Sequence, residues 1–444
     1  MSRIRSNLLK KSAAMAGAML LSSFSFAWAE EVQVFNGKDF SNWYGRETIS
    51  QAKYDALPQE KKDELNATIA KHWKIEGDEI VNDGHGAFLS TKEDYQDFDF
   101  SFDYKIVANC DSGVYLRGVP QVQIWDTKSE ASIKHGADKG SGGLWNNPKD
   151  WPGKDPLVLA DNPTGEWNSL KVRLIGERCS VWLNGKLVVD NARLHNYYAP
   201  GEPLPKAGPI QLQTHGGEIR FKNLKLVTHD AAEANKLLSE AETKAAGDNK
   251  FVSVFNGKDF TGWAGAVDNY TIVDGAIQCL KGKGGTLYTE NTYADFVARV
   301  DFKLPPAGNN GLAIRYPSPS ELTGGKDPAY VGMTELQVLD DGHPSYANLD
   351  PRQRHGSVYG IAAAKTGYLR PVGEWNHQIV KVEGSRITVE LNGTTILDSD
   401  ISGINEFMAN TPHPGKDRTS GHFGFAGHSD EVQFRNVEIQ TLNK

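Results

Sequence analysis

Residues 180–190 read SVWLNGKLVVD, and residues 387–398 read ITVELNGTTILD. In both stretches apolar and polar residues alternate on either side of an Asn-Gly pair. Such alternation is typical of half-buried β-strands, and Asn-Gly is the commonest hairpin turn because both positions tolerate positive φ. The two stretches therefore predict antiparallel hairpins, and DFDFSFDYKI at 97–106 predicts a further strand of the same kind.

The two hairpins belong to a longer internal repeat. EVQVFNGKDFSNWYG at 31–45 recurs as FVSVFNGKDFTGWAG at 251–265. Five further pairs follow in the same order: GVYLR and GLAIR, VQIWD and LQVLD, GEWN at 165–168 and 373–376, LNG at 183–185 and 391–393, and FKN at 221–223 with FRN at 434–436. Because the period is far longer than that of a solenoid unit, the pattern indicates a tandem duplication of one whole domain.

The repeat divides the chain into four predicted segments. We expect a signal peptide at 1–29, a first domain at 30–228 with a helical insertion at about 47–72, a helical linker at 229–250, and a second domain at 251–444. A loop rich in Pro, Ser and Gly is expected in the second domain, from Tyr316 to Gly332. Many strands, few helices and frequent turns predict an all-β fold, a β-sandwich or jelly roll, for each domain.

The N-terminus has the pattern of an export signal. Four cations between Arg3 and Lys11 precede an apolar stretch from Ala13 to Leu21, and Ala27-Trp28-Ala29 offers a cleavage site after Ala29. No other stretch is long and apolar enough to predict insertion into a membrane. We therefore expect a periplasmic or secreted protein.

Composition excludes several classes of function. The chain of 444 residues has a formal net charge of −8, which disfavours an extended surface for nucleic acid or anionic lipid. It contains no nucleotide-binding or zinc-protease motif. Its three cysteines are too scattered for a disulfide framework or a Cys-based zinc site; buried thiols are favoured, while a Cys110–Cys179 bridge stays open. The oligomeric state is not predicted.

The ordered set of shared motifs resembles the 3-keto-disaccharide hydrolase domain family, formerly a bacterial domain of unknown function. The resemblance covers both repeats and implies concanavalin-like jelly-roll sandwiches that act on sugars with a ketone at C3. The family's typical Glu-x-Gln-x-x-Asp strand is kept in domain 2 as Glu335, Gln337 and Asp340, whereas domain 1 has Gln121 in place of the Glu. This departure leaves open which repeat is catalytic.

The implied chemistry needs a base and a group that stabilises an enolate. A ketone at C3 acidifies the proton on C2, so a base can remove it, the leaving group can depart from C1, and water can then add. Imidazole or carboxylate groups suit the base, and Arg, imidazolium or a divalent metal suit the enolate. The predicted catalytic residues are Arg117, Asp126, His215, Arg315, Glu335, Asp340 and His355.

The predicted substrate-binding residues are polar or aromatic. They are Gln121, Gln123, Trp125, Trp145, Gln337 and His428. Trp125 and Trp145 occur only in domain 1, which favours sugar stacking there, whereas Trp43, Trp167, Trp263 and Trp375 are shared by both repeats and are interpreted as core packing.

Two questions remain open on the sequence alone. Asp111 is either a metal ligand or a turn former, and a divalent metal, calcium or a transition metal, is compatible with the sequence although no ligand spacing requires one. The function is either that of an enzyme with its site on the concave face of a repeat, or that of a sugar-binding protein without turnover whose duplication increases avidity.

Overall fold

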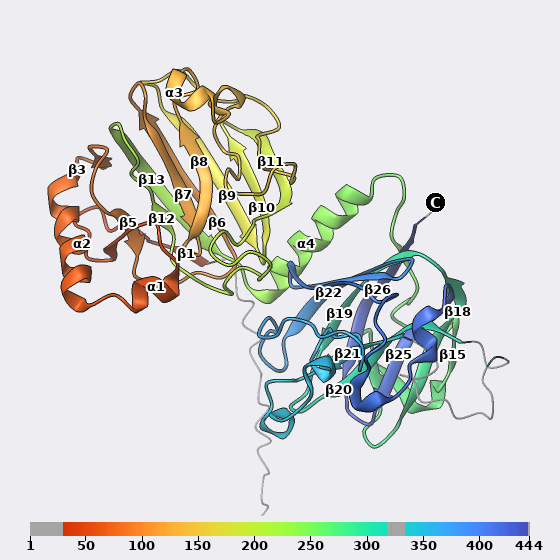
Figure 1. Ribbon diagram of the computed structural model, residues 1–444. Coiled ribbons are helices and arrows are strands. Elements are labelled where there is room, and N and C mark those ends of the chain that lie inside the picture. The colour runs from red at the N-terminus through yellow and green to blue at the C-terminus, as the bar shows by residue number, and fades with distance from the viewer. Residues whose placement is uncertain (1–29, 318–320, 322–333, 443–444) are drawn as a thin grey trace, which may run out of the picture.

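The computed structural model describes residues 30–317, 321 and 334–442. They form two β-sandwiches, one from each repeat, and in each an eight-stranded antiparallel sheet packs on a five-stranded one (Figure 1). The predicted class, two tandem all-β sandwiches, is confirmed. The predicted signal peptide and most of the predicted 316–332 loop lie outside the described residues.

Domain 1 places the five-stranded sheet in the order β2-β5-β12-β7-β8. Its strands are β2 (Trp43–Arg46), β5 (Phe88–Thr91), β7 (Asp111–Leu116), β8 (Val119–Trp125) and β12 (Gln211–Leu212). The larger sheet contains β1 (Glu30–Val32), β3 (Trp73–Glu76), β4 (Glu79–Asn82), β6 (Phe98–Ile106), β9 (Asn168–Ile175), β10 (Arg178–Leu183), β11 (Lys186–Arg193) and β13 (Ile219–Thr228).

Domain 2 repeats this arrangement, with the five-stranded sheet in the order β15-β18-β25-β20-β21. Its strands are β15 (Trp263–Gly265), β18 (Gly284–Tyr293), β20 (Asn309–Tyr316), β21 (Thr334–Leu339) and β25 (Gly421–His428). The larger sheet contains β14 (Val252–Ser253), β16 (Tyr270–Val273), β17 (Ala276–Cys279), β19 (Phe296–Lys303), β22 (Trp375–Glu383), β23 (Arg386–Leu391), β24 (Thr394–Asp400) and β26 (Gln433–Thr441).

Helices lie in the insertion, in one loop and between the domains. The α-helices are α1 (Gln51–Asp55), α2 (Gln59–His72), α3 (Glu130–Ile133) and α4 (Ala231–Ala246). Short 3₁₀ turns cover Ala137–Lys139, Val267–Asn269, Pro344–Tyr346, Pro351–Gln353, Met408–Asn410 and Pro414–Asp417. Within the described residues no helix is both long enough and apolar enough to cross a membrane.

Each sandwich has its own apolar core. The strands alternate, so that one face of each sheet points inward: in β6, Phe98, Phe100 and Phe102 are at most 1% exposed. In domain 2 the rings of Trp263, Phe425 and Phe434 stack in sequence across the core. Two separate cores mean that each repeat is a domain in the physical sense.

The two Asn-Gly hairpins form as the sequence predicts. Asn184 and Gly185 have φ of 50° and 76°, and Asn392 and Gly393 have 52° and 77°, as a tight two-residue hairpin turn requires. The second turn also touches domain 1, because a Cβ on Gly393 would lie 2.7 Å from the backbone oxygen of Ile175. The Asn392-Gly393 turn and the turn after β9 therefore meet backbone to backbone.

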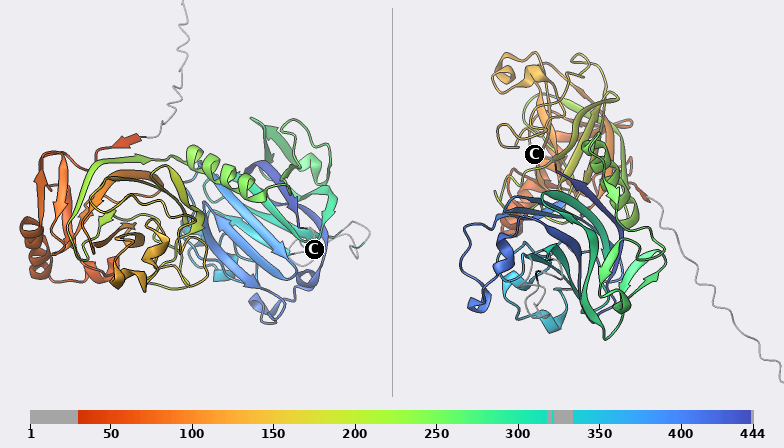
Figure 2. Two further views of the ribbon diagram at one scale, coloured as in Figure 1. Left: turned by 90° about the horizontal axis from the view of Figure 1, so that it is seen from above. Right: turned by 90° about the vertical axis from the view of Figure 1, so that its right-hand side faces the viewer.

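The linker helix α4 joins the two domains along one flank (Figure 2). Asp230 caps its N-terminus by accepting a hydrogen bond of 2.8 Å from the backbone N–H of Glu233. Ala234 and Leu238 bury their side chains against Ile175 of domain 1. An adjoining part of the helix surface presents Glu242 to the outer face of the larger sheet of domain 2.

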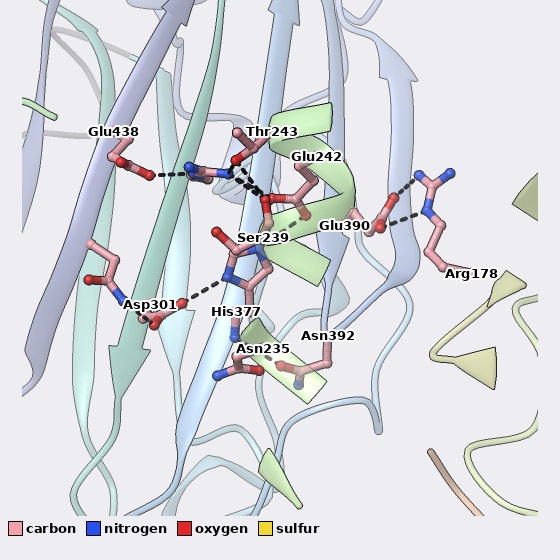
Figure 3. Close-up of polar contacts among 12 residues, drawn as sticks. Arg178, Asn235, Ser239, Glu242, Thr243, Asp301, His377, Glu390, Asn392 and Glu438 are labelled. Atoms are coloured by element: carbon pink, nitrogen blue, oxygen red, sulfur yellow. Dashed lines mark hydrogen bonds and ion pairs between the residues drawn. The ribbon is translucent and has the colours of Figure 1, made fainter. Parts of the chain in front are cut away.

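His377 on β22 is held between α4 and its own sheet (Figure 3). Its Nε2 lies 3.1 Å from both carboxylate oxygens of Glu242 on α4, and its Nδ1 lies 2.8 Å from Asp301 on β19. The ring is 3% exposed, so burial acts against its charge. The two carboxylates outweigh that cost and raise the pKa of His377 to about 10. At neutral pH His377 is therefore a buried cation that fixes α4 to domain 2.

Further polar contacts join the domains directly. Arg178 on β10 forms a bidentate ion pair with Glu390 on β23 (Figure 3). The hydroxyl of Tyr368 donates to the backbone oxygen of Leu204 at 3.1 Å. With the turn contact and α4, these bonds give the two sandwiches a continuous interface.

The structure corrects part of the interpretation of the shared tryptophans. Trp43 and Trp263 are core residues, 3% and 5% exposed. Trp167 and Trp375 are instead only partly buried, and each lies under two cations, such as Lys222 at 4.1 Å from the Trp167 ring. Their presence in both repeats reflects cation–π contacts on the outer face of the larger sheet. All three cysteines are buried free thiols.

Candidate functional site

A pocket of about 300 Å³ opens on the outer face of the five-stranded sheet of domain 1. Its floor comes from β7, β8 and the end of β12, and its walls come from loops. The floor residues are Asp111, Tyr115, Gln121, Gln123, Trp125, Gln213 and His215, and the wall residues are Thr48, Ser132, His135, Trp145, Asn146 and Tyr197. A volume of this size suits a sugar unit.

Strand alternation explains why polar groups gather there. Val114, Val122 and Ile124 point into the core, so their neighbours on β7 and β8 point outward. Gly113 lies opposite Gln123, and a Cβ on it would be 2.9 Å from Oε1 of Gln213. The missing side chain at this position leaves room for the glutamine amides to converge.

A row of hydrogen bonds crosses the pocket floor. The amide of Gln121 donates to Oε1 of Gln123, and Nε2 of Gln123 donates to Oδ1 of Asp111 at 2.7 Å. The other carboxylate oxygen of Asp111 lies 3.1 Å from Nδ1 of His215. The row therefore orients the carboxylate, and the carboxylate orients the imidazole.

His215 has the properties of a proton-transfer group. Its hydrogen bond to Asp111 raises its pKa above the ordinary value, against partial desolvation. Its side chain is 67% exposed, and with Nδ1 held by Asp111 the other ring nitrogen, Nε2, is left to meet a ligand. An imidazole that is oriented by a carboxylate and open on its far side is the usual arrangement of a general acid or base.

The same pocket offers groups that bind a sugar. Gln213 is 6% exposed, and its Oε1 has no hydrogen-bond partner among the described residues. A buried acceptor in this state gains most from a donor such as a hydroxyl. At the rim, Trp145 and Tyr197 are 36% and 48% exposed, and exposed aromatic rings are the common platforms for sugar faces.

Five predicted residues of domain 1 meet in this pocket. They are Gln121, Gln123, Trp125, Trp145 and His215. The indole N–H of Trp125 donates to the backbone oxygen of Gly140 at 2.9 Å, so this ring, which is 5% exposed, supports the loop wall. The rest of the predicted set from domain 1, Arg117 and Asp126, lies elsewhere.

Arg117 and Arg315 hold the fold, and the catalytic role predicted for them is corrected. Arg117 is 3% exposed and donates to backbone oxygens and to Asp97 at 3.0 Å. Arg315 makes the equivalent bonds, including one of 3.0 Å to Asp295. Both aspartates also accept from the N–H of a glycine in the next hairpin turn. Because these guanidinium groups are fully engaged, they cannot serve an enolate.

Asp126 and Asp340 are turn residues, which corrects a second pair of predictions. Oδ2 of Asp126 accepts from the backbone N–H of Asn109 at 2.8 Å, and Oδ2 of Asp340 accepts from that of Ala307 at 2.9 Å. Each carboxylate thus closes the loop that leads into β7 or β20. The repeat keeps them for the turn, not for chemistry.

His355 is a core residue, contrary to its predicted catalytic role. It is 2% exposed, and its ring lies 5.0 Å from that of Phe302. Nδ1 accepts from the backbone N–H of Leu339, and Nε2 lies 3.0 Å from Oε1 of Gln378. Burial lowers its pKa to about 4. At neutral pH it is a neutral, fully bonded ring that no substrate reaches.

The remaining predicted residues, Glu335, Gln337 and His428, lie together on the five-stranded sheet of domain 2. Nε2 of Gln337 donates to Asn309 at 2.9 Å, as Gln123 does to Asp111 in domain 1. Nε2 of His428 lies 3.6 Å from Oε1 of Glu335. Both domains therefore keep an imidazole beside a carboxylate on the same sheet.

Several residues of the domain 1 pocket were missed by the sequence reasoning, or left undecided. The sequence predicts Asp111 only as a metal ligand or a turn former, and Gln213, Tyr115 and Tyr197 are not among the predicted residues. A comparison of the repeats carries a signal for two of them: Gln213 and Tyr115 correspond to Ala426 and Ala313. A position that is polar or aromatic in one copy and Ala in the other points to a use beyond the fold.

The pocket does not fit a metal ion on the donors it offers. It is lined by one carboxylate, Asp111, and by two imidazoles, His135 and His215, of which only His215 contacts Asp111. Across the described ranges no group of three or more His, Cys, Asp or Glu side chains is placed to hold a metal ion. No step of the chemistry below is therefore routed through a metal.

A family model and a known protein match the chain. The model, described as the 3-keto-alpha-glucoside-1,2-lyase-like domain, matches residues 30–227 and again residues 250–440. A protein of Bacteroides thetaiotaomicron named 3-keto-disaccharide hydrolase is 26% identical over 273 residues, covering 54% of this chain and 92% of that protein.

Two solved structures match part of the chain. The "Putative glycosyl hydrolase" of Parabacteroides distasonis is 26% identical, covers 44% of this chain and 100% of its own, and has a TM-score of 0.38. A carbohydrate-binding module of Bacillus subtilis is 16% identical, covers 40% of this chain and 96% of its own, and has a TM-score of 0.29.

Proposed function

Because the chain belongs to the 3-keto-alpha-glucoside-1,2-lyase-like domain family in both of its repeats, we propose that it is an exported enzyme that cleaves 3-keto-glycosides in the pocket of domain 1. The relative of known name acts on 3-keto-disaccharides, as its name states. Elimination is the proposed route: loss of the C2 proton, departure of the leaving group from C1, and later hydration of the enone.

The observation that carries the proposal is the Asp111–His215 pair. Neutral His215 takes the C2 proton at Nε2, and the electrons of the C–H bond pass into the C3 ketone as an enolate. The imidazolium formed is stabilised by Asp111, which lies 3.1 Å from Nδ1, and it then returns the proton to the departing oxygen at C1. A positioned imidazole typically contributes about 10²- to 10⁴-fold to such a rate.

Other groups of the pocket fit the sugar itself. Side-chain amides on the floor supply N–H donors toward the enolate oxygen. Oε1 of Gln213, which lacks a partner among the described residues, accepts from a sugar hydroxyl. Trp145 and Tyr197 stack on the less polar faces of the rings. The pocket thus orients a neutral substrate without needing a charged one.

The test compares the protein with its pocket variants on a 3-keto-disaccharide and on the unoxidised parent sugar, in D₂O, with and without chelator. We expect cleavage of the keto sugar alone, with deuterium exchanged into C2. His215→Ala should lower the rate at least 10²-fold, while the matched change His428→Ala in domain 2 should leave release of the leaving group unchanged. Loss of activity with chelator would require a metal and would contradict this mechanism.

The rival function is a sugar-binding protein without turnover, which the exposed rings of Trp145 and Tyr197 would serve equally well. The His215→Ala variant separates the two. An enzyme should lose turnover and keep most of its affinity for the keto sugar. If the unmodified protein binds both sugars and cleaves neither, the binding function is correct.

Export is the remaining part of the proposal. It rests on the cationic and apolar pattern of residues 1–29. N-terminal sequencing of the protein recovered from the periplasm or medium should begin at Glu30. Retention of Met1 in the cytoplasm would refute export without affecting the proposed reaction.

A further inference from the structure

The carboxylate that lies beside the histidine is on a different strand in each repeat. In domain 1 the acid is Asp111 on β7, and the position on β8 that faces the same pocket is Gln121. In domain 2 the matching position on β20 is Asn309, an amide, and the position on β21 is Glu335, an acid. The histidine of each repeat still has one carboxylate beside it, at 3.1 Å in domain 1 and 3.6 Å in domain 2.

Glu335 has a buried carboxylate with a hydrogen-bond acceptor that is unsatisfied within the described residues. It is 3% exposed, and its Oε1 has no hydrogen-bond donor among the described residues. Its ion-pair partner is His428, and a buried acceptor without a hydrogen-bond donor gains most from a hydroxyl or water that donates to it. Gly311 lies opposite Gln337 on the neighbouring strand β20, and a Cβ there would collide with Oε1 of Glu335. The absence of a side chain at Gly311 therefore lets the Glu335 carboxylate lie against β20.

His428 is close to Glu335 without closing a hydrogen bond. The 3.6 Å between Nε2 and Oε1 exceeds hydrogen-bond length, and the His428 side chain is 44% exposed. Glu335 nevertheless raises the pKa of His428. A hydroxyl or water molecule at Oε1 would satisfy the buried acceptor and would lie next to an imidazole able to donate a proton.

We propose that Glu335 and His428 form a second acid–base centre, in domain 2, that adds water to the enone released by domain 1. Glu335 takes a proton from water, whose oxygen bonds to C1 of the enone. The π electrons of C1=C2 move to C2 through the enolate of the C3 ketone, and C2 takes a proton from the His428 imidazolium. Protonated Glu335 then returns its proton to His428. The sum is one water added, with no oxidation or reduction.

This proposal rests on the proposed function, because that reaction is what supplies the enone. Its test does not depend on that reaction. The isolated enone is supplied directly, and its disappearance is followed by the loss of conjugated ultraviolet absorbance against an enzyme-free control. Release of the leaving group from the 3-keto-glycoside is measured separately with each variant.

Glu335→Gln should slow hydration of the supplied enone at least 10²-fold and leave release of the leaving group intact, which also shows that the variant is folded. His215→Ala should show the reverse. Glu374→Gln, an exposed acid of domain 2, is the matched control and should change neither.

Three results would overturn the inference. They are hydration by Glu335→Gln at the normal rate, failure of the unmodified protein to hydrate the enone while it still releases the leaving group, and loss of both activities in a Glu335→Gln variant with normal urea unfolding. If the unmodified protein hydrates the enone and releases no leaving group, the inference stands and the proposed function fails.

Discussion

Replacing His377 by Gln should destabilise the protein in a way that depends on pH. The change removes a buried cation and leaves Glu242 and Asp301, which face it at 3.1 and 2.8 Å, without their shared partner. Breaking a buried ion pair from one side costs about 3–5 kcal/mol. We expect that loss in the free energy of unfolding at pH 6, where the imidazole is charged in the folded state.

The sign of the pH dependence follows from the raised pKa. The pKa of His377 is about 10 in the folded protein and 6.5 by its model value. Its stabilising effect is therefore complete below pH 6.5 and is lost as the pH rises through about 10. Between pH 7 and pH 9 the folded state holds one proton more, so the advantage over the variant should fall by about 1.4 kcal/mol per pH unit.

The assay is urea unfolding followed by tryptophan fluorescence at pH 6, 7, 8 and 9, with His85→Gln, an exposed histidine of domain 1, as control. The control should match the unmodified protein throughout. A difference between His377→Gln and the unmodified protein that stays constant from pH 7 to pH 9 would refute the reasoning, because it would mean that His377 is neutral in the folded state.

Three further predictions concern the pocket and the interface. Asp111→Asn should lower the pKa of His215, shifting the acidic limb of the kcat/KM profile to lower pH and reducing the plateau about 10²-fold; an unmoved limb would exclude His215 as the base. Trp145→Ala should raise KM about three- to tenfold through lost stacking, with kcat little changed. Gly185→Ala and Gly393→Ala impose the same backbone strain, at φ of 76° and 77°, and each should lower the free energy of unfolding by about 1 kcal/mol. Only the new methyl group of Gly393→Ala would collide with the other domain, so this variant should lose about 1–3 kcal/mol more in urea unfolding. Equal losses would refute the turn-to-turn contact.

Local sequence patterns predict most of the fold. Alternation and Asn-Gly pairs depend on neighbouring residues, so the hairpins at Gly185 and Gly393 follow from the sequence directly. The interface does not, because nothing local to Gly393 reveals that a backbone oxygen of domain 1 lies 2.7 Å from its missing Cβ.

The candidate site was also only partly predictable from local sequence patterns. His215 is predicted from the sequence and has a counterpart, His428, in the second repeat, whereas its partner Asp111 is far away in sequence and approaches only because β12 pairs with β7. Occurrence in both repeats also led to a wrong prediction. Arg117 and Arg315 are present in both copies because each joins a turn to a strand, and not because they are catalytic. The occurrence of a residue in both repeats therefore does not show whether its role is structural or catalytic.

The contact between α4 and domain 2 has a consequence for the history of the chain. A duplicated domain starts as a unit that folds alone, yet the buried charge of His377 is now balanced by Glu242, a carboxylate on the segment between the copies. A fragment that begins at Phe251 would lack that carboxylate. We therefore expect that domain 2 no longer folds stably without the linker helix. Recombination that separates the two copies at the linker should then be selected against.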